Sequence, residues 1–287
     1  MTERLSGYTT LIGLMATPIR HSLSPLMHNE SFAKLGLDYA YLAFEVGNES
    51  LADAVASIRV LGMRGCNISM PNKKKVLSYL DDISQAAKLI GAVNTIVNDE
   101  GVLTGYNTDG IGFMRSLKEE NINIIGKKMT MMGAGGAATA ICMQAALDGV
   151  KEISIFNRQG ETFENAKRMI TLINEETGCR AVLYDLAEKA QLKKEIETSA
   201  ILINGTSVGM NPYEGQSLIN DPKFFHSDLI VADVIYKPAK TKLLEIAEAS
   251  GCKTINGLGM MLYQGAAAFE LWTGKEMPVE HIRKLLF

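Results

Sequence analysis

The sequence lacks the cysteine and histidine patterns of disulfide-rich and metal-binding proteins. The four cysteines include no CxxC pair and are scattered along the chain, at Cys66, Cys142, Cys179 and Cys252. This usage is typical of a cytosolic protein whose thiols stay reduced and mostly buried. The four histidines show neither HExxH nor Cys/His clustering and stand at His21, His28, His226 and His281. We therefore predict no metal site.

Charge of one sign and long apolar runs are also missing. The chain has 29 Lys and Arg against 32 Asp and Glu, so no basic excess indicates a nucleic-acid partner. No apolar run is long enough to span a bilayer, and the early stretch LIGLMA at 11–16 is too short for a signal peptide. These absences favour a cytoplasmic protein that acts on a small molecule and has no membrane partner.

Strand-like and helix-like apolar patterns alternate along the 287 residues and predict an α/β protein of two domains. In the first domain we expect strands at 11–16, 39–46, 65–70 and 92–98, with helices at 24–36, 49–62, 72–80 and 84–90. A helix from Asp109 to about residue 120 leads into the second domain. There we expect strands at 128–132, 152–156, 180–184, 200–204 and 229–234, with helices at 136–148, 161–177, 187–198 and 241–250. Two further helices follow at 259–273 and 279–286, and the alternation indicates mostly parallel sheets.

A glycine-rich turn in the second domain has the context of a dinucleotide-binding fingerprint. The strand MTMM runs into GAGGAA at 133–138, a helix follows, and EISIF forms the next strand. In this arrangement Gly133 allows the tight turn, Gly135 lets the backbone approach a pyrophosphate, and Ala138 packs helix against strand. We therefore predict a Rossmann domain that binds a dinucleotide, with its pyrophosphate at the start of this helix.

The end of the second Rossmann strand gives a mixed signal about the cofactor. An acidic residue there holds the ribose hydroxyls of NAD, whereas a basic one accommodates the 2′-phosphate of NADP. The chain offers Asn157 and Arg158, then Gln159 and Gly160, then Glu161. Arg158 could meet a phosphate or stack on adenine, and Glu161 could hold the ribose.

Lys73 stands where a predicted strand passes into a predicted helix behind Pro71. This is the place at which open α/β sheets build their sites. Lys73 is therefore a candidate catalytic residue, while Lys74 and Lys75 are expected on a solvent-exposed face.

Parts of the sequence also fit two other functions. The segment 205–209 reads GTSVG and matches the GxSxG nucleophile elbow of an α/β-hydrolase esterase, with Asp233 and His281 following in the expected order. An elbow must open directly into a helix, however, and here a loop containing Pro212 and Gly215 follows. The Rossmann pattern alone also fits a nucleotide-binding regulatory protein without catalysis.

The motifs together resemble the shikimate dehydrogenase family over nearly the full length, most closely its quinate/shikimate dehydrogenase branch. The resemblance rests on eight segments in order: PIRHSLSP at 18–25, NISMPNK at 67–73, GAVNT at 91–95, GYNTDG at 105–110, GAGG at 133–136, NR at 157–158, NGT at 204–206 and NGLGMMLYQG at 256–265. It implies hydride exchange between NAD(P) and shikimate or 3-dehydroshikimate, and extends to quinate and 3-dehydroquinate. It is also compatible with a homodimer.

The resemblance assigns roles to individual residues. Lys73 and Asp109 would form the catalytic pair. Substrate-binding residues would be Ser22, Ser24, Tyr41, Ser69, Asn94, Thr108 and Gln264. Cofactor-binding residues would be Gly133, Ala134, Gly135, Gly136, Ala137, Asn157, Arg158, Glu161, Thr206, Ser207, Val234, Tyr236 and Gly257. The site would lie in a cleft between an N-terminal substrate domain, residues 1–112 with helices 259–287 packing back on it, and a Rossmann domain at 113–258.

One departure from the family pattern concerns the cofactor. NADP-preferring relatives follow the arginine with Ser or Thr, and NAD-using relatives of the quinate branch carry an Asp where this chain has Gly160. Glu161 stands one residue later. We predict NAD as the preferred cofactor, with NADP as the alternative.

Overall fold

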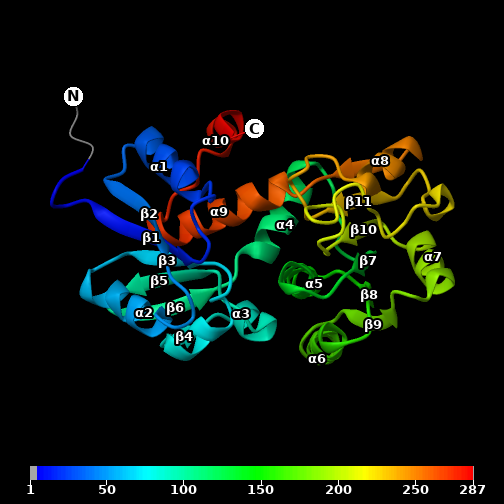
Figure 1. The fold of residues 1–287 in the computed structure, drawn as a ribbon, viewed down its shortest axis with the longest axis horizontal. Coiled ribbons are helices and arrows are strands. Elements are labelled where there is room, and N and C mark those ends of the chain that lie inside the picture. Colours follow the sequence, from blue (N-terminus) through cyan, green and yellow to red (C-terminus); the bar gives the residue numbers. More distant parts are fainter. Residues whose placement is uncertain (1–4, 287) are drawn as a thin grey trace. The chain divides into compact units, whose positions relative to one another are not determined.

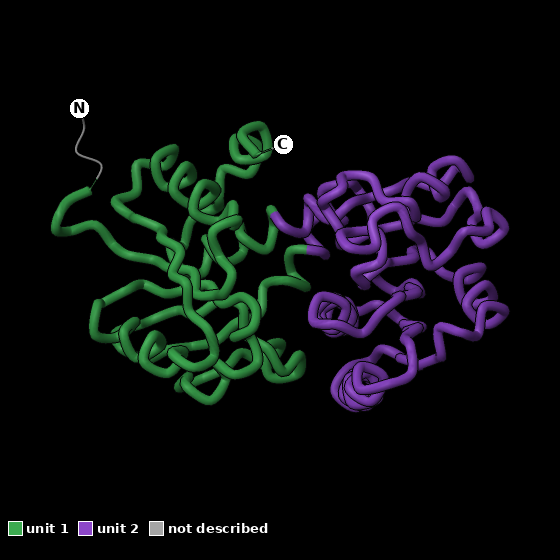
Figure 2. Tube along the Cα trace, in the orientation of Figure 1, with its two compact units in different colours: residues 1–112, 262–287 green, residues 113–261 purple. Residues whose placement is uncertain are grey.

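The structure is a computed structural model that describes residues 5–286. The chain forms two compact units, shown in Figure 2. Unit 1 contains residues 1–112 and 262–287, and unit 2 contains residues 113–261. The division falls inside two helices, α4 (Asp109–Glu119) and α9 (Leu258–Thr273).

A six-stranded sheet of order β2-β1-β3-β5-β6-β4 forms the centre of unit 1 (Figure 1). The strands are β1 (Thr10–Ala16), β2 (Tyr39–Glu45), β3 (Gly65–Ile68), β4 (Asp82–Ile83), β5 (Thr95–Asp99) and β6 (Val102–Tyr106). The helices are α1 (Ser24–Leu35), α2 (Leu51–Val60), the 3₁₀ turn η1 (Lys75–Tyr79), α3 (Gln85–Ile90), the start of α4, most of α9 and α10 (Val279–Leu286).

Helices cover both faces of this sheet, so each face has its own apolar core. On one face α1, α9 and α10 pack against β1 and bury Phe32, Phe269 and Trp272. On the other face α2, η1 and α3 bury Leu51, Val76 and similar side chains. Strands covered on both faces carry continuous apolar runs, which is why LIGLMA in β1 shows no alternation of polar and apolar residues.

Unit 2 is a doubly wound parallel sheet of order β12-β11-β10-β7-β8-β9. Its strands are β7 (Lys128–Met132), β8 (Glu152–Asn157), β9 (Arg180–Asp185), β10 (Ile201–Asn204), β11 (Ile230–Asp233) and β12 (Lys253–Ile255). Its helices are α5 (Gly136–Leu147), α6 (Glu161–Glu176), α7 (Lys189–Glu197), the 3₁₀ turn η2 (Pro222–Phe224) and α8 (Lys242–Ala249), besides most of α4 and the start of α9. The chain reverses its direction of strand addition between β7 and β10, the point at which Rossmann folds bind dinucleotides.

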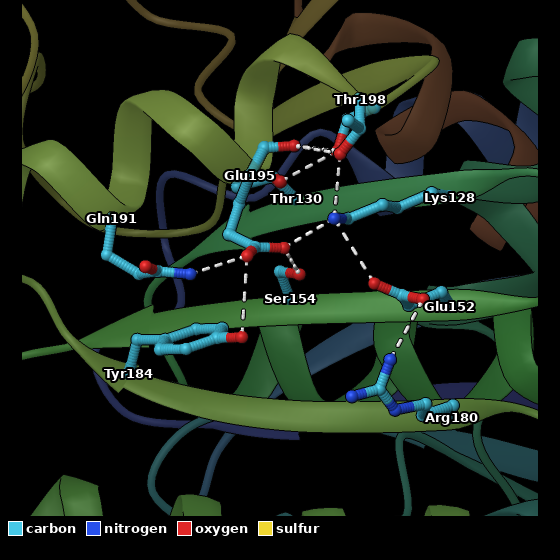
Figure 3. A network of polar contacts seen from close by, with 10 residues as sticks. Lys128, Thr130, Glu152, Ser154, Arg180, Tyr184, Gln191, Glu195 and Thr198 are labelled. Atoms are coloured by element: carbon cyan, nitrogen blue, oxygen red, sulfur yellow. Dashed lines mark hydrogen bonds and ion pairs between the residues drawn. The ribbon is translucent and has the colours of Figure 1, made fainter.

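A partly buried ionic network ties the amino ends of β7 and β8 to α7 (Figure 3). Lys128 contacts Glu195, which also accepts hydrogen bonds from Ser154 at 2.7 Å and Gln191 at 2.6 Å. Burial works against the ionised form of Glu195, but the hydrogen bond and positive charge of Lys128, with the hydrogen bonds from Ser154 and Gln191, outweigh it and lower the pKa of the carboxyl group. The network therefore joins a helix to two strands at the sheet edge opposite the glycine-rich turn.

Some sequence expectations are wrong. Residues 72–80 do not form an α-helix but a turn followed by η1, because tertiary contacts hold this segment. The unit 1 sheet is mixed, since β5 runs antiparallel to both β3 and β6. The short strands β4, β6 and β12 were not anticipated. Helices from α5 to α10, by contrast, begin and end within about two residues of their expected bounds.

Candidate active site

Lys73 and Asp109, which are 36 residues apart in sequence, meet in unit 1. The Lys73 ammonium donates a hydrogen bond to Oδ2 of Asp109 at 2.6 Å. The two side chains are 24% and 15% exposed, so the pair is partly shielded from water but still reachable by a small ligand. Such a pair combines a proton donor with an anion that orients it.

Asn94 fixes the other oxygen of the carboxylate. Its Nδ2 donates to Oδ1 of Asp109 at 2.8 Å and to Thr108 Oγ1 at 3.0 Å. Its Oδ1 accepts the backbone N–H of Thr108 at 2.9 Å and the hydroxyl of Thr95 at 2.9 Å. Asn107 completes the turn, since its Oδ1 accepts the backbone N–H of Asp109. The Asp109 carboxylate is therefore held from both sides before any ligand binds.

The turn that carries Lys73 is anchored from below by Asn72. The Asn72 side chain is fully buried, and its Nδ2 donates to the carbonyl oxygen of Val46 at 2.8 Å. The carbonyl oxygen of Lys73 itself accepts the N–H of Val93 at 2.9 Å. Lys74 is exposed, and Lys75 is exposed with its ammonium donating to the carbonyl oxygen of Asn48. Of the three lysines, Lys73 is thus the one directed to Asp109.

The remaining predicted substrate residues lie on α1, β2, the end of β3 and α9. Ser22 and Ser24 are half-buried at the start of α1, where Ser22 Oγ accepts the N–H of Ser24. Tyr41 is fully buried and donates its hydroxyl to Asn67 Oδ1 at 2.7 Å. Burial is the main cause that raises the pKa of Tyr41 well above its ordinary value, so the hydroxyl keeps its proton.

Sequence reasoning missed Asn67 and Asn72. Asn67 Nδ2 donates to the carbonyl oxygen of Asn94 and to Thr95 Oγ1, which joins the Tyr41 contact to the Asp109 network. Both asparagines are buried in the structure. In the sequence, the placing of both asparagines in NISMPNK, among apolar residues, could have indicated polar side chains that need hydrogen-bond partners. Ser69, which follows β3, and Gln264 on α9 are half-buried.

The glycine-rich turn of unit 2 is open where a ligand would meet it. Gly133 has φ 101°, a conformation that favours glycine, and a Cβ there would lie 2.7 Å from Thr206 Cγ2. Gly135 and Gly136 are exposed, and a Cβ on either would meet no atom within 4 Å. Since no side chain caps α5, its first N–H groups remain available to an anion, which suits a pyrophosphate. Ala134 is buried and Ala137 half-buried beside them.

The loop after β8 carries the predicted ribose contacts. Asn157 is buried and donates to Thr162 Oγ1 at 2.9 Å, whereas Arg158 and Glu161 are both exposed. Gln159 Nε2 donates to Asp185 Oδ2 at 2.8 Å, so a second carboxylate lies beside this loop. Asp185 is not among the cofactor-binding residues predicted from the sequence.

The esterase alternative fails on local structure. Ser207 is exposed, but no helix starts after it, and the 205–209 segment is a turn followed by an irregular loop. Asp233 is not directed to a histidine, because its carboxylate accepts hydrogen bonds from Asn204, Thr241 and the N–H of Ile235.

The described residues also contain no group of three or more His, Cys, Asp or Glu side chains able to hold a metal ion.

The other predicted cofactor residues follow β10, β11 and β12. Thr206 is half-buried and hydrogen-bonded to Asn204, Val234 is half-buried, and Tyr236 is exposed. Gly257 is buried, and its N–H donates to the carbonyl oxygen of Ile235. All of them stand at the carboxyl edge of the sheet, the edge at which Rossmann folds bind their ligands.

Known proteins are similar to this chain in sequence and in fold over its full length. Shikimate dehydrogenase (NADP(+)) from Listeria monocytogenes serotype 4b (strain F2365) is 62% identical over 287 residues, which cover 100% of this chain and 99% of that protein. The chain belongs to the shikimate dehydrogenase family. The family descriptions that match are the shikimate dehydrogenase substrate binding domain at residues 14–96 and the shikimate 5'-dehydrogenase C-terminal domain at residues 257–287.

Solved structures of this family extend the comparison. The crystal structure of shikimate 5-dehydrogenase from Listeria monocytogenes, in complex with shikimate and NAD, is 62% identical with a TM-score of 0.98. It covers 100% of this chain and 99% of its own. Quinate dehydrogenase from Corynebacterium glutamicum in complex with NAD is 31% identical, with a TM-score of 0.86 and coverage of 96% and 98%. The family resemblance and the α/β class inferred from sequence are thereby confirmed.

Proposed function

We propose that this member of the family interconverts shikimate and 3-dehydroshikimate by hydride exchange with NAD(P), with Lys73 and Asp109 as the catalytic pair. The observation that carries the assignment of roles is the 2.6 Å contact between the Lys73 ammonium and an Asp109 carboxylate that Asn94 already holds. An isolated surface ion pair would not require such a buried scaffold.

The chemistry of a ketone and its alcohol suits this pair. When bound, the nicotinamide cofactor supplies or accepts the hydride. As the ketone is reduced, negative charge develops on its oxygen, and the Lys73 ammonium stabilises that charge and transfers a proton from Nζ. In the reverse direction Nζ takes the proton from the hydroxyl. Asp109 orients Nζ in both directions, because its second oxygen is fixed by Asn94.

Substrate recognition is assigned to polar side chains of unit 1. The substrate carboxylate and ring hydroxyls would be contacted by Ser22, Ser24, Tyr41, Ser69, Asn94, Thr108 and Gln264. Serine and tyrosine hydroxyls can donate as well as accept, so the same set would serve quinate, which differs from shikimate by a tertiary hydroxyl and a saturated bond. We propose quinate as a second substrate.

NAD is proposed as the preferred cofactor. Exposed Arg158 attracts a 2′-phosphate, but Glu161 begins α6 nearby and Asp185 is held against Gln159 in the same loop region. Two carboxylates oppose one guanidinium, and the extra phosphate of NADP is doubly charged at neutral pH. The Listeria monocytogenes relative named for NADP(+) makes NADP the alternative.

The cellular setting stays a proposal. All four cysteines are free and buried, which suits a reducing cytoplasm. Among the described residues no helix is both long and apolar enough to cross a membrane. A homodimer is proposed from the family resemblance alone.

The test is an initial-rate assay with shikimate and quinate, each with NAD and with NADP. Lys73→Ala should lower turnover by about two to four orders of magnitude, the usual contribution of general acid–base catalysis. Lys74→Ala is the matched control, since Lys74 is exposed on the same turn, and Lys75→Ala is a second; both should stay near wild type. A Lys73→Ala enzyme with normal turnover would refute the assignment, and a wild type inactive in all four assays would refute the function.

A further inference from the structure

Asp233 is a buried carboxylate without a role in the chemistry described above. It is the last residue of β11 and is 1% exposed. Its neighbour across the sheet is Asn204, the last residue of β10, which lies beside β7 at the switch point of the fold. Asp233 thus stands one strand away from the place at which a dinucleotide binds.

Its two oxygens are hydrogen-bonded by donors from three segments. Oδ1 accepts the N–H of Ile235 at 3.0 Å, and Oδ2 accepts the hydroxyl of Thr241 at 2.7 Å. Asn204 Nδ2 is 3.1 Å from both oxygens. Every one of these donors is uncharged, so the carboxylate is not part of an ion pair. A buried charge satisfied only by neutral donors is costly and stays in place only if the donors are fixed around it.

Through Asn204 the carboxylate orders the loop after β10. With Nδ2 committed to Asp233 and to the carbonyl oxygen of Val208, Asn204 turns its Oδ1 towards the loop. That oxygen accepts the N–H of Thr206 at 3.1 Å and its hydroxyl at 2.7 Å. Thr206 in turn packs on the glycine-rich turn, since a Cβ on Gly133 would be 2.7 Å from its methyl group.

Through Ile235 and Thr241 the same carboxylate orders the loop after β11. Both ends of the segment 234–241 are thereby tied to one side chain. Gly257 packs against this segment so closely that a Cβ would lie 2.0 Å from the carbonyl oxygen of Val234. The loop carries Val234 and Tyr236, which the family resemblance assigns to the cofactor site.

We propose that Asp233 is a positioning residue for the nicotinamide cofactor. Its carboxylate fixes the loops 204–208 and 234–241 relative to each other and to the glycine-rich turn. This inference rests on the proposed function for the identity of the ligand. An amide cannot replace the carboxylate, because its single oxygen cannot accept from Thr241, Ile235 and Asn204 together.

The experiment measures binding of NAD and of NADP to the whole enzyme by calorimetry, and then steady-state kinetics with shikimate. Asp233→Asn should weaken binding of the better cofactor by about tenfold or more, the effect of losing one hydrogen bond to a charged group. Thr241→Val should weaken it by about threefold to tenfold, and Thr241→Ser, which keeps the hydroxyl, should restore it. Asp228→Asn is the matched control, because Asp228 is an exposed carboxylate shortly before the same strand.

In kinetics the KM for the cofactor should rise while the KM for shikimate stays within about twofold, since the loops concern one ligand only. A general loss of structure would change both constants and lower the melting temperature of every variant alike. If Asp233→Asn does not fold, Thr241→Val and Thr241→Ser decide. Unchanged cofactor binding in Thr241→Val, or equal changes in both KM values, would overturn the inference.

The two proposals fail differently. A wild type that binds NAD or NADP without oxidising shikimate refutes the proposed function, while the binding series still tests Asp233. An active wild type whose Asp233→Asn variant binds cofactor normally refutes only the positioning role. A wild type that binds neither cofactor overturns both.

Discussion

The His28→Leu substitution should make unit 1 markedly less sensitive to acid. His28 is fully buried in α1, and its ring stacks on Tyr41 at 4.5 Å between centroids, with Trp272 edge-on at 5.3 Å. Neither ring nitrogen has a hydrogen-bond partner among the described residues. Burial alone lowers the pKa of His28 to about 3, so the imidazole is neutral in the folded protein at every ordinary pH.

The sign follows from the two states. In the unfolded chain the histidine pKa is about 6.5, so the unfolded state binds one more proton than the folded state between about pH 6.5 and pH 3. Stability is therefore lost as the pH falls through this window. From pH 7.5 to pH 5 the loss amounts to roughly 1.5 pH units at about 1.36 kcal/mol each, or about 2 kcal/mol.

The assay is urea unfolding followed by circular dichroism at several values between about pH 7.5 and pH 5. Leucine has a similar volume but binds no proton. As the pH falls from about 7.5 to about 5, the free energy of unfolding of His28→Leu should therefore rise by about 2 kcal/mol relative to that of the wild type. Asp233, whose pKa burial raises to about 6, has the opposite dependence, but it is present in both proteins and cancels in the difference. His21→Gln, at an exposed histidine, is the control. Parallel pH profiles for wild type and His28→Leu would refute the reasoning.

Two further predictions concern unit 2. Lys128→Met leaves the buried Glu195 without its cation and should lower the free energy of unfolding by about 2–4 kcal/mol in urea titrations, whereas Lys127→Met, at the exposed neighbouring residue, should change it little. An effect of Lys128→Met as small as that of Lys127→Met would show that the network in Figure 3 contributes little stability. Glu161→Ser and Asp185→Asn should each raise the ratio of kcat/KM for NADP to that for NAD several-fold, with Glu164→Ser on the next turn of α6 as the control. A wild type that favours NADP, or a ratio that neither substitution moves, would contradict the assignment of these carboxylates.

The sequence predicted unit 2 well because its strands are continuous apolar runs between helices with regular periodicity. Residues 128–132 were expected as a strand and form β7 with the same bounds. The glycine-rich turn at 133–136, between a strand and a helix, is also typical of a Rossmann fold. The residues of the site could be gathered only through family resemblance, since nothing in the local pattern states that Lys73 contacts Asp109.

What the sequence could not reveal depends on contacts between distant residues. The segment 72–80 carries Pro71, three lysines and an apolar pair, a pattern compatible with a helix, but the buried amide of Asn72 bonds to Val46 and keeps a turn instead. The interior position of His28 depends in the same way on Tyr41, Phe269 and Trp272, which reach it from β2 and α9. The sequence order of Ser207, Asp233 and His281 also fits a hydrolase triad, but in the structure Asp233 accepts its hydrogen bonds from other residues, Asn204, Ile235 and Thr241.

The discontinuity of unit 1 has a consequence for how the protein is made. Trp272 and Phe269 belong to the core that β1 and α1 line, and Trp272 Nε1 donates to the carbonyl oxygen of Ile96. Residues 1–112 leave the ribosome before this tryptophan has been translated, and the roughly 150 residues of unit 2 intervene, which takes on the order of 10–30 s at about 5–20 residues per second. During that interval α1 alone covers one face of the first sheet, while unit 2, which is continuous in sequence, can complete its own core. The nascent chain is therefore most exposed to aggregation at its oldest segment until α9 completes this core.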